Sequence, residues 1–323
     1  MMQFNRDTFK GKKIIVTGGT GSIGSEIVRQ LLKMEVAQVR VYSNDEYQQF
    51  KFMEEIGGDK RLRFLLGDIR DKERMDHAFK EADICYHAAA LKHVPICEYN
   101  PFEAVKTNIL GSQNVIELAI KHNLEKVIAI STDKAVDPHS VLGTTKLIME
   151  RLITSAKYLT ASSQTKFAAV RFGNVLRSRG SVLETWEEQI KKGGPVTVTD
   201  PNMTRFFMET ADAINLILKA TEIMQGAEIF VLKMKKTNMM DLARQTIKKF
   251  SPSKDIEIKV TGIRQGEKLY EKLLSEVEIE STMETDDMFV ILPQIVPDFA
   301  PQIPANYPYR QIEKNKIIYR SDQ

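Results

Sequence analysis

Hydrophobic positions in the first half of the chain alternate between short continuous runs and longer stretches with helical spacing. The short runs are typical of buried strands and occupy residues 12–19, 38–43, 61–68, 82–90, 125–131 and 166–175. Stretches with helical spacing lie between them, at residues 23–34, 46–56 and 101–122. For the third of these, Asn100 is the expected cap and Pro101 lies in the first turn. Strands that alternate with helices predict an α/β fold of the Rossmann type, a doubly wound parallel sheet covered on both faces.

The pattern becomes mixed after about residue 175. Helical spacing recurs at 209–224 and 238–250, and short strands are expected near 196–199 and 228–233. We therefore predict a Rossmann domain over residues 1–175 and a smaller C-terminal lobe over residues 176–323, interleaved and with an approximate boundary. The Pro-rich stretch 297–310 predicts an extended tail over the surface.

Composition narrows the class of protein. The chain has 323 residues, of which 42% are hydrophobic and 28% charged, as in an ordinary soluble globular protein. A net charge of +3 with scattered basic residues argues against a nucleic-acid partner. Since no apolar run approaches a membrane span, and no signal peptide core or disulfide framework is present, a cytoplasmic location is expected. The histidines form no pair at metal-ligand spacing, so no metal site is predicted.

A glycine-rich stretch, TGGTGSIGSE at residues 17–26, follows the first predicted strand and opens the first predicted helix. Glycines at this spacing allow a tight turn and a close approach of the backbone, so that the helix N-terminus can meet a pyrophosphate. We predict a nicotinamide dinucleotide here; the alternative is a glycine-rich turn without a ligand. The predicted contacts are Gly18, Thr20, Gly21, Ser22, Ile23 and Gly24.

The end of the second predicted strand should lie beside the adenine ribose. NAD-preferring sites place an acid at this point, whereas this chain has Ser43, then Asn44 and Asp45. The hydroxyls of Ser43 and Thr20 could donate to a 2′-phosphate, although no arginine follows to neutralise it. The balance favours NADP, with NAD as the alternative. Asp68 and Ile69, after the third strand, are predicted at the adenine edge; the alternative for Asp68 is a plain turn carboxylate.

Several stretches together resemble a known family: VTGGTGSIGSE, HAAALKHVPICEYNPFEAVKTNILGSQNVI, STDKAV, TTK, RFGNVLRSRGSV, TRFF and GIRQGEKLYE. They resemble the extended short-chain dehydrogenase/reductases and, within them, the UDP-N-acetylglucosamine 4,6-dehydratases of bacterial surface-glycan and flagellin-sugar pathways. The resemblance covers residues 16 to about 271. It implies the substrate UDP-N-acetylglucosamine, a tightly held nicotinamide that is regenerated each turnover, and a homo-oligomer, a dimer or hexamer.

The family's reaction oxidises carbon 4 of the sugar, eliminates water across carbons 5 and 6, and returns the hydride to carbon 6. The resemblance implies that Asp133 is the acid for the leaving hydroxyl and Lys134 the base at carbon 5. Lys134 can serve only if its pKa falls from about 10.4 toward neutrality, through burial or a neighbouring cation such as Lys146. The alternative for Asp133 and Lys134 is a solvated turn pair. An epimerase, which only oxidises and reduces carbon 4, would not need this pair.

Leu142 occupies the position at which the wider superfamily carries a catalytic tyrosine, one helical turn before Lys146. Three interpretations remain open. In the first, the chain binds the cofactor without catalysis, as a regulatory or scaffold protein. In the second, another phenol, such as Tyr99, takes the proton of the 4-hydroxyl. In the third, which we favour, Lys146 and the Thr132 hydroxyl remove that proton themselves.

The resemblance also assigns contacts around the sugar and the nicotinamide. Further cofactor contacts are expected at Ala88, Ala89, Ala90, Lys92, Asn108, Ser131 and Lys146. Substrate contacts are expected at Lys92, His93, Asn174, Val182, Thr197, Arg205, Arg264 and Glu267. Arginine suits a diphosphate because its planar fork meets phosphate oxygens bidentately. The alternatives are a structural role for His93 and surface ion pairs for the two arginines.

Overall fold

A ten-stranded sheet is the centre of the computed structural model, which describes residues 4–159, 164–253, 255–293, 310–312 and 319–323. Its strands are β1 (Lys13–Thr17), β2 (Gln38–Ser43), β3 (Leu62–Leu66), β4 (Ile84–His87), β5 (Lys126–Thr132), β6 (Lys166–Phe172), β10 (Ile229–Leu232), β13 (Thr282–Glu284), β14 (Met288–Ile291) and β15 (Arg310–Gln311). The order across the sheet is β15-β13-β14-β10-β6-β5-β4-β1-β2-β3. The strands from β3 to β10 pair in parallel, and β14, β13 and β15 extend the sheet antiparallel.

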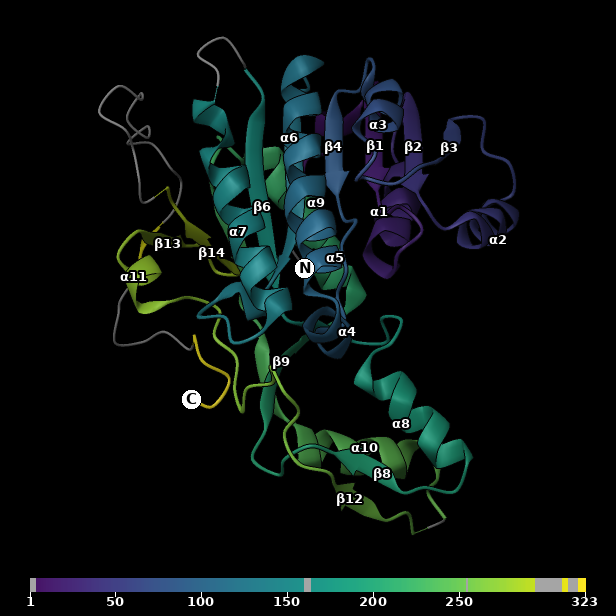
Figure 1. Ribbon diagram of the computed structural model, residues 1–323, viewed down its shortest axis with the longest axis vertical. Helices are drawn as coiled ribbons and strands as arrows, with labels where there is room; N and C mark the ends of the chain where they lie inside the picture. Colours follow the sequence, from purple (N-terminus) through teal and green to yellow (C-terminus); the bar gives the residue numbers. More distant parts are fainter. Residues whose placement is uncertain (1–3, 160–163, 254, 294–309, 313–318) are drawn as a thin grey trace.

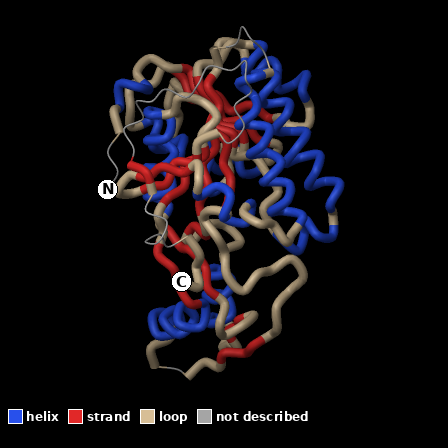
Figure 2. Tube along the Cα trace, turned by 90° about the vertical axis from the view of Figure 1, so that its left-hand side faces the viewer, coloured by secondary structure: helices blue, strands red, loops and turns tan. Residues whose placement is uncertain are grey.

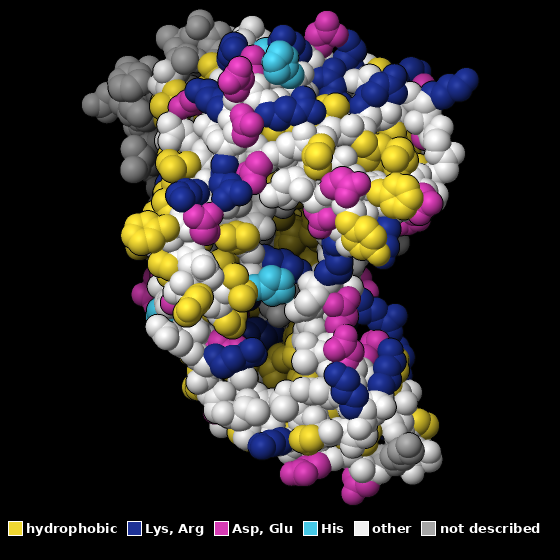
Figure 3. Space-filling view, turned by 45° about the vertical axis from the view of Figure 1, so that its right-hand side comes forward, with side chains coloured by type: hydrophobic (Ala, Val, Ile, Leu, Met, Phe, Trp, Pro, Cys, Tyr) yellow, Lys and Arg dark blue, Asp and Glu magenta, His cyan; other side chains and the backbone are white. Residues whose placement is uncertain are grey.

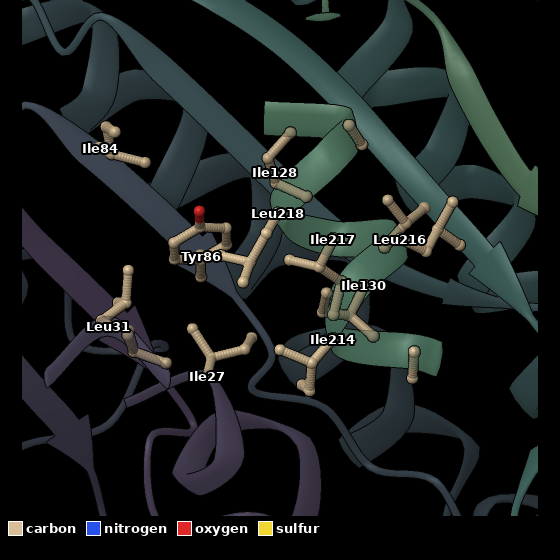
Figure 4. Close-up of a cluster of buried hydrophobic side chains, with 14 of the residues drawn as sticks. Ile27, Leu31, Ile84, Tyr86, Ile128, Ile130, Ile214, Leu216, Ile217 and Leu218 are labelled. Atoms are coloured by element: carbon tan, nitrogen blue, oxygen red, sulfur yellow. The ribbon is translucent and has the colours of Figure 1, made fainter. Parts of the chain in front are cut away.

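Helices cover both faces of this sheet (Figures 1 and 2). One face carries α1 (Ser22–Leu32), α2 (Glu46–Ile56) and α9 (Thr210–Ile223); the other carries α3 (Lys72–Phe79), α6 (Gly111–Lys121) and α7 (Val141–Ser155). Figure 4 shows the hydrophobic core on the face covered by α1 and α9, where Ile27 and Ile217 lie beside Tyr86 of the sheet. The predicted Rossmann-type doubly wound fold is confirmed.

Polar caps start several of these helices at loops after strands. Asp45 accepts from the Gln48 N–H at the start of α2, and Asp71 accepts from the Arg74 N–H at the start of α3. Ser140 accepts from the Gly143 N–H and starts α7. Each cap satisfies a helix N–H that has no partner within its helix. These short connections bring the helix starts to the carboxyl edge of the sheet, the edge at which ligands bind in open parallel sheets.

A smaller lobe extends from that edge, at the bottom of Figure 1. It contains α8 (Val182–Lys191), β8 (Val196–Val198), α10 (Met239–Phe250) and β12 (Ile258–Val260), which pack around the buried Trp186. A three-stranded sheet, β7 (Asn174–Val175), β9 (Thr204–Met208) and β11 (Lys235–Asn238), lies at its junction with the main body. Part of the chain after residue 175 returns to the large sheet through α9 and β10. The division of domains at residue 175 stays a prediction.

Two expected elements are divided in the structure. The helix expected over 101–122 is α5 (Pro101–Ala104), a π-helical segment (Val105–Leu110) and α6. Asn100 precedes α5, but its side chain donates to the Ile96 carbonyl instead of capping the helix. The strand expected over 166–175 ends at Phe172, and Asn174 pairs in the other sheet, because the chain turns at Gly173.

Other elements were not predicted, among them the short helices α3, α4 (Val94–Tyr99) and α11 (Glu276–Ile279). Helix α8 was missed although its apolar residues Val182, Trp186 and Ile190 recur every four positions. The Pro-rich stretch 297–310 lies, apart from Arg310, outside the described residues.

Candidate active site

Three adjoining cavities form one cleft between the carboxyl edge of the large sheet and the smaller lobe, where the surface in Figure 3 is hollowed. The first cavity, about 350 Å³, lies beyond β2 and shares Gly18, Gly21 and Ala88 with the second. The second, about 630 Å³, lies beyond β5 and shares Lys134 and Asn174 with the third. The third cavity, about 170 Å³, opens into the smaller lobe. An elongated ligand can therefore extend through all three.

The glycine loop between β1 and α1 lines the first and second cavities. Gly18 has φ +64°, and a Cβ there would lie 2.7 Å from the Ala89 nitrogen. A Cβ on Gly24 would lie 2.2 Å from the Gly18 carbonyl oxygen. Only glycine allows the loop to lie this close to β4 and to the first turn of α1. The resulting cradle fits a pyrophosphate at the N-terminus of an eleven-residue helix.

A hydroxyl at the end of β2 faces a hydroxyl of the glycine loop. The side-chain oxygens of Thr20 and Ser43 are 2.8 Å apart and buried, at the lining of the first cavity. Asn44 donates to Asp68, which is also paired with Arg70 at 2.8 Å. Burial favours the neutral form of Asp68, but the hydrogen bonds from Arg70 and Asn44 outweigh it, so the pKa of Asp68 is lowered.

Two arginines line the first cavity, although none follows closely after Ser43 in the sequence. Arg70 lines it but is engaged by Asp68 and by Glu103, at 2.8 Å each. Arg179, from the loop after β7, lines both the first and second cavities, and its guanidinium donates to the Thr20 carbonyl. This residue was missed because it lies far along the chain from Thr20 and Ser43.

The residues after β5 form a buried cluster. Asp133 has no exposed surface; its Oδ1 accepts from the Thr132 hydroxyl and from Lys134 Nζ, each at 3.0 Å. Its Oδ2 has no hydrogen-bond partner among the described residues and faces Gly173, where a Cβ would lie 3.0 Å away. Asp133 is fully buried and the Lys134 side chain is 23% exposed, so the geometry does not support the alternative of a solvated turn pair.

The pKa of Lys134 is shifted in the direction opposite to the one that the sequence analysis required. Burial, the largest effect, disfavours the ammonium, but the attraction of Asp133 and Glu271 together is greater, so the pKa of Lys134 is raised. The opposing cation is Arg205 and not Lys146. Lys134 Nζ is 3.6 Å from Glu271 Oε1, and Glu271 was not predicted as a site residue.

Lys146 has the opposite environment. It lies in α7, is 7% exposed, and donates to the Ile130 carbonyl at 2.8 Å. Burial lowers the pKa of Lys146 to about 8. Leu142 lines the second cavity together with Lys146 and packs in a cluster with Cys97 and Ala104. Tyr99 is 87% exposed and lines none of the three cavities, so the geometry does not support it as the alternative phenol.

The structure brings most of the remaining predicted residues to the cleft. The second cavity is lined by Ser22, Ile23, Gly24, Ala90, Lys92, His93, Ser131 and Thr132. The first is also lined by Asp45, Ile69 and Ala89. The third is lined by Val182, Thr197, Arg205, Arg264 and Glu267. Asp133 and Asn108 line none of the three: Asn108 is buried and bonds the Leu91 backbone and the Thr145 hydroxyl, so it holds the loop after β4.

Two of the predicted substrate contacts have partners of their own. Arg264 is paired with Glu267 at 3.0 Å. Arg205 is 6% exposed, and its guanidinium donates to the Thr204, Lys268 and Leu269 carbonyls. Part of the fork that was predicted to bind a diphosphate is therefore occupied by backbone.

The described residues contain neither a membrane-spanning helix nor a group of metal ligands. No described helix combines the length and the apolar composition needed to cross a membrane. No group of three or more histidine, cysteine, aspartate or glutamate side chains in the described ranges is arranged to hold a metal ion.

Comparison with known proteins gives consistent matches over most of the chain. A protein from Methanocaldococcus jannaschii, named an uncharacterized membrane protein, is 49% identical over 99% of this chain and 94% of its own length. The UDP-N-acetylglucosamine 4,6-dehydratase (inverting) of Campylobacter jejuni is 40% identical over 89% of this chain and 84% of its own. The UDP-glucose 4-epimerase of Rickettsia canadensis is 38% identical over 88% of this chain and 83% of its own.

A solved structure matches the fold equally widely. The crystal structure of Pen from Bacillus thuringiensis superposes with a TM-score of 0.88 at 41% identity, over 98% of this chain and 95% of that one. The family model described as "Polysaccharide biosynthesis protein" matches residues 14–293. The chain therefore belongs to this polysaccharide biosynthesis protein family, with the fold of the short-chain dehydrogenase/reductases.

Proposed function

We propose that the protein is a nucleotide-sugar 4,6-dehydratase that converts UDP-N-acetylglucosamine into a UDP-4-keto-6-deoxy-N-acetylhexosamine. The observation that carries the proposal is the ion pair between the buried Asp133 and the partly buried Lys134, which lines the second and third cavities. Elimination of water needs one acid and one base close together, and an epimerase does not. The similarity to the dehydratase of Campylobacter jejuni supports the same reaction.

The cofactor proposed for the first and second cavities is NADP, with NAD as the alternative. When bound, the nicotinamide accepts a hydride from carbon 4 and returns it to carbon 6. The Gly18–Gly24 cradle would hold the pyrophosphate, and the Thr20 and Ser43 hydroxyls lie where a 2′-phosphate is expected. Arg179, which has no carboxylate partner among the described ion pairs, supplies a cation that suits this phosphate.

The protons are handled by side chains of the chain itself. At carbon 4, the neutral amine of Lys146 accepts the hydroxyl proton, since burial lowers the pKa of this lysine to about 8. At carbon 5, the neutral amine of Lys134 takes the proton as the carbon–oxygen bond at carbon 6 breaks, and Asp133 protonates the departing oxygen to form water. This leaves Lys134 as ammonium and Asp133 as carboxylate, the ion pair observed at 3.0 Å. As the hydride returns to carbon 6, the Lys134 ammonium gives a proton to carbon 5. Release of the Lys146 proton to solvent and uptake of one proton by Asp133 then restore the reactive form.

Proton NMR of a reaction in deuterated water tests the proposal. UDP-N-acetylglucosamine incubated with the protein and NADP should gain a carbon-6 methyl signal, and deuterium should enter at carbon 5. Formation of a 4-epimer without a methyl group would favour the epimerase. An unchanged sugar in the presence of bound cofactor would favour the non-catalytic protein.

A homo-oligomer is the proposed assembly. Apolar side chains of α4 and α5 are strongly exposed: Ile96 at 56%, Tyr99 at 87% and Phe102 at 79%. Such surface is typical of protein–protein contacts. Light scattering coupled to size exclusion should give the mass of a dimer or hexamer, and a monomer at micromolar concentration would contradict this.

A further inference from the structure

Glu271 is a buried carboxylate to which the sequence assigned no role. It is 2% exposed and lines the third cavity beside Lys134. Its Oε1 lies 3.6 Å from Lys134 Nζ and 3.8 Å from Arg205 Nε, and its Oε2 lies 3.7 Å from Lys268 Nζ. Oε2 accepts no hydrogen bond from any residue that the structure describes. A carboxylate this enclosed usually has its hydrogen bonds filled.

The backbone around Glu271 is fixed from two sides. Its N–H donates to the Ser321 hydroxyl and its carbonyl accepts from the Ser321 N–H, each at 2.9 Å. The preceding carbonyls, of Lys268 and Leu269, accept from Arg205 at 2.7 and 3.1 Å. The carboxylate is thus held in place by contacts that leave its own oxygens available to the surrounding cations.

Lys134 Nζ has three oxygen neighbours for its three N–H groups. These are Asp133 Oδ1 at 3.0 Å, Asn174 Oδ1 at 3.4 Å and Glu271 Oε1 at 3.6 Å. They come from three separate segments of the chain, so the position of the nitrogen does not depend on the flexible lysine side chain alone. Asp133 gives up its proton during the proposed elimination, whereas Glu271 takes no part in proton transfer and lies within 4 Å of Lys134, Arg205 and Lys268.

We infer that Glu271 is a positioning residue for Lys134: it fixes the nitrogen at the cleft and stabilises the ammonium that forms when Lys134 takes the proton from carbon 5. The inference rests on the proposed dehydratase function. In this step the carbon 5–hydrogen bond breaks, its electron pair forms the carbon 5–carbon 6 double bond, and the proton goes to Nζ. The electron pair of the broken carbon 6–oxygen bond stays on the oxygen, which leaves as water with the proton of Asp133.

The charge of the cluster agrees with this role. The pKa of Lys134 is raised despite burial, by Asp133 and Glu271, while Arg205 opposes them. The pKa of neighbouring Lys268 is lowered by burial, and it is also affected by the charges of Glu271, Asp133, Asp137 and Lys134. Because Glu271 strengthens the base, the chemical step should slow when its charge is removed, even though a larger share of Lys134 would then be neutral.

The test compares Glu271→Gln with the wild-type protein in single-turnover experiments with NADP and UDP-N-acetylglucosamine. The substitution keeps the size of the side chain and removes its charge. We expect oxidation at carbon 4 within about 2-fold of wild type, and elimination slowed by about 10-fold, less than the 10²–10⁴ that a whole general base contributes. Reduced nicotinamide should then accumulate, and the pH at which elimination reaches half its maximum should move to lower pH. Glu271→Asp should recover part of the rate.

Glu276→Gln is the matched control, since Glu276 is an exposed carboxylate on the nearby α11. Glu271→Gln with wild-type elimination and an unshifted pH profile would overturn the role of Glu271 and leave the dehydratase proposal intact. Loss of oxidation and elimination together in both Glu271 variants would also overturn it, because the residue would then act on the structure of the whole site. A wild-type protein that forms no methyl product would overturn both the proposed function and this inference.

Discussion

The pH dependence of oxidation at carbon 4 tests whether Lys146 replaces the missing tyrosine. Only the neutral amine can accept the hydroxyl proton, so the rate should follow the neutral fraction of Lys146. The pKa of this lysine is lowered to about 8 because its ammonium is buried. The rate should therefore rise with pH up to about 8 and level off above it.

The structure sets the size of this effect. Lowering the pKa from 10.5 to about 8 increases the neutral fraction near pH 7 by about 300-fold, since each pH unit is a factor of ten. About one Lys146 in ten is then neutral at pH 7, against roughly one in 3,000 for an ordinary lysine. Between pH 5 and pH 7 the oxidation rate should increase by about 10-fold per pH unit.

The assay is single-turnover formation of reduced nicotinamide, with substrate that carries hydrogen or deuterium at carbon 4. An isotope effect shows that hydride transfer is being measured. Lys146→Met, which keeps a similar length, should lower the rate by at least about 10²-fold. Lys146→Arg keeps the charge and cannot give a neutral base, so it should fail as badly. A rate that is flat between pH 6 and pH 9, or substantial oxidation by Lys146→Met, would refute the role of Lys146.

Four further substitutions separate the roles of the other residues. Asp133→Asn should allow oxidation at carbon 4 but block loss of water, so that reduced nicotinamide persists in the absorbance trace; no reduced cofactor would count against the order of steps. Ser43→Asp should weaken NADP by at least about 10-fold relative to NAD, because a carboxylate repels a 2′-phosphate; equal affinities by titration would place Ser43 elsewhere. Leu142→Tyr should still dehydrate, since the leucine at the cleft carries no group that transfers a proton; NMR that shows loss of product, in a variant with unchanged cofactor affinity, would contradict this. Arg171→Leu should reduce the free energy of unfolding by about 3–5 kcal/mol, because Glu150 loses its buried partner at 2.6 Å; denaturant unfolding that changes by less than about 1 kcal/mol would contradict this.

The fold could be predicted because its signal is local and repeated. Most of the first six predicted strands, such as β1 and β5, contain continuous apolar runs, and burial on both faces of a parallel sheet requires such runs. Helix α3 gave no clear signal because it has eight residues and a mostly polar sequence. The π-helical segment Val105–Leu110 was missed because the apolar spacing of 101–122 fits one regular helix equally well.

The site could be predicted where one strand end carries several functional groups. The glycine loop follows β1, Thr132 ends β5 and Lys134 comes just after it, and parallel strands bring these ends together. Arg179 and Glu271 could not be found in this way. They reach the cleft from loops distant in sequence, and only the folded chain shows that Arg179 contacts Thr20 and that Glu271 contacts Lys134.

Two lysines of the cleft show why residue type alone could not assign the chemistry. Lys134 and Lys146 both line the second cavity, yet the pKa of Lys134 is raised and that of Lys146 is lowered. Lys134 lies within 3.6 Å of two carboxylates, whereas Lys146 donates to the neutral Ile130 carbonyl. In the proposed first step, the lowered pKa of Lys146 supplies a neutral amine near pH 7. Because the 4-hydroxyl is a weak acid, the proton that Lys146 accepts must soon be released again. At carbon 5, the raised pKa makes the neutral amine of Lys134 a stronger base but keeps most of this lysine protonated, so the lowered pKa that the sequence analysis required is not met. The fold thus gives two identical side chains pKa values shifted in opposite directions, and the proposed mechanism assigns one of the two proton transfers to each.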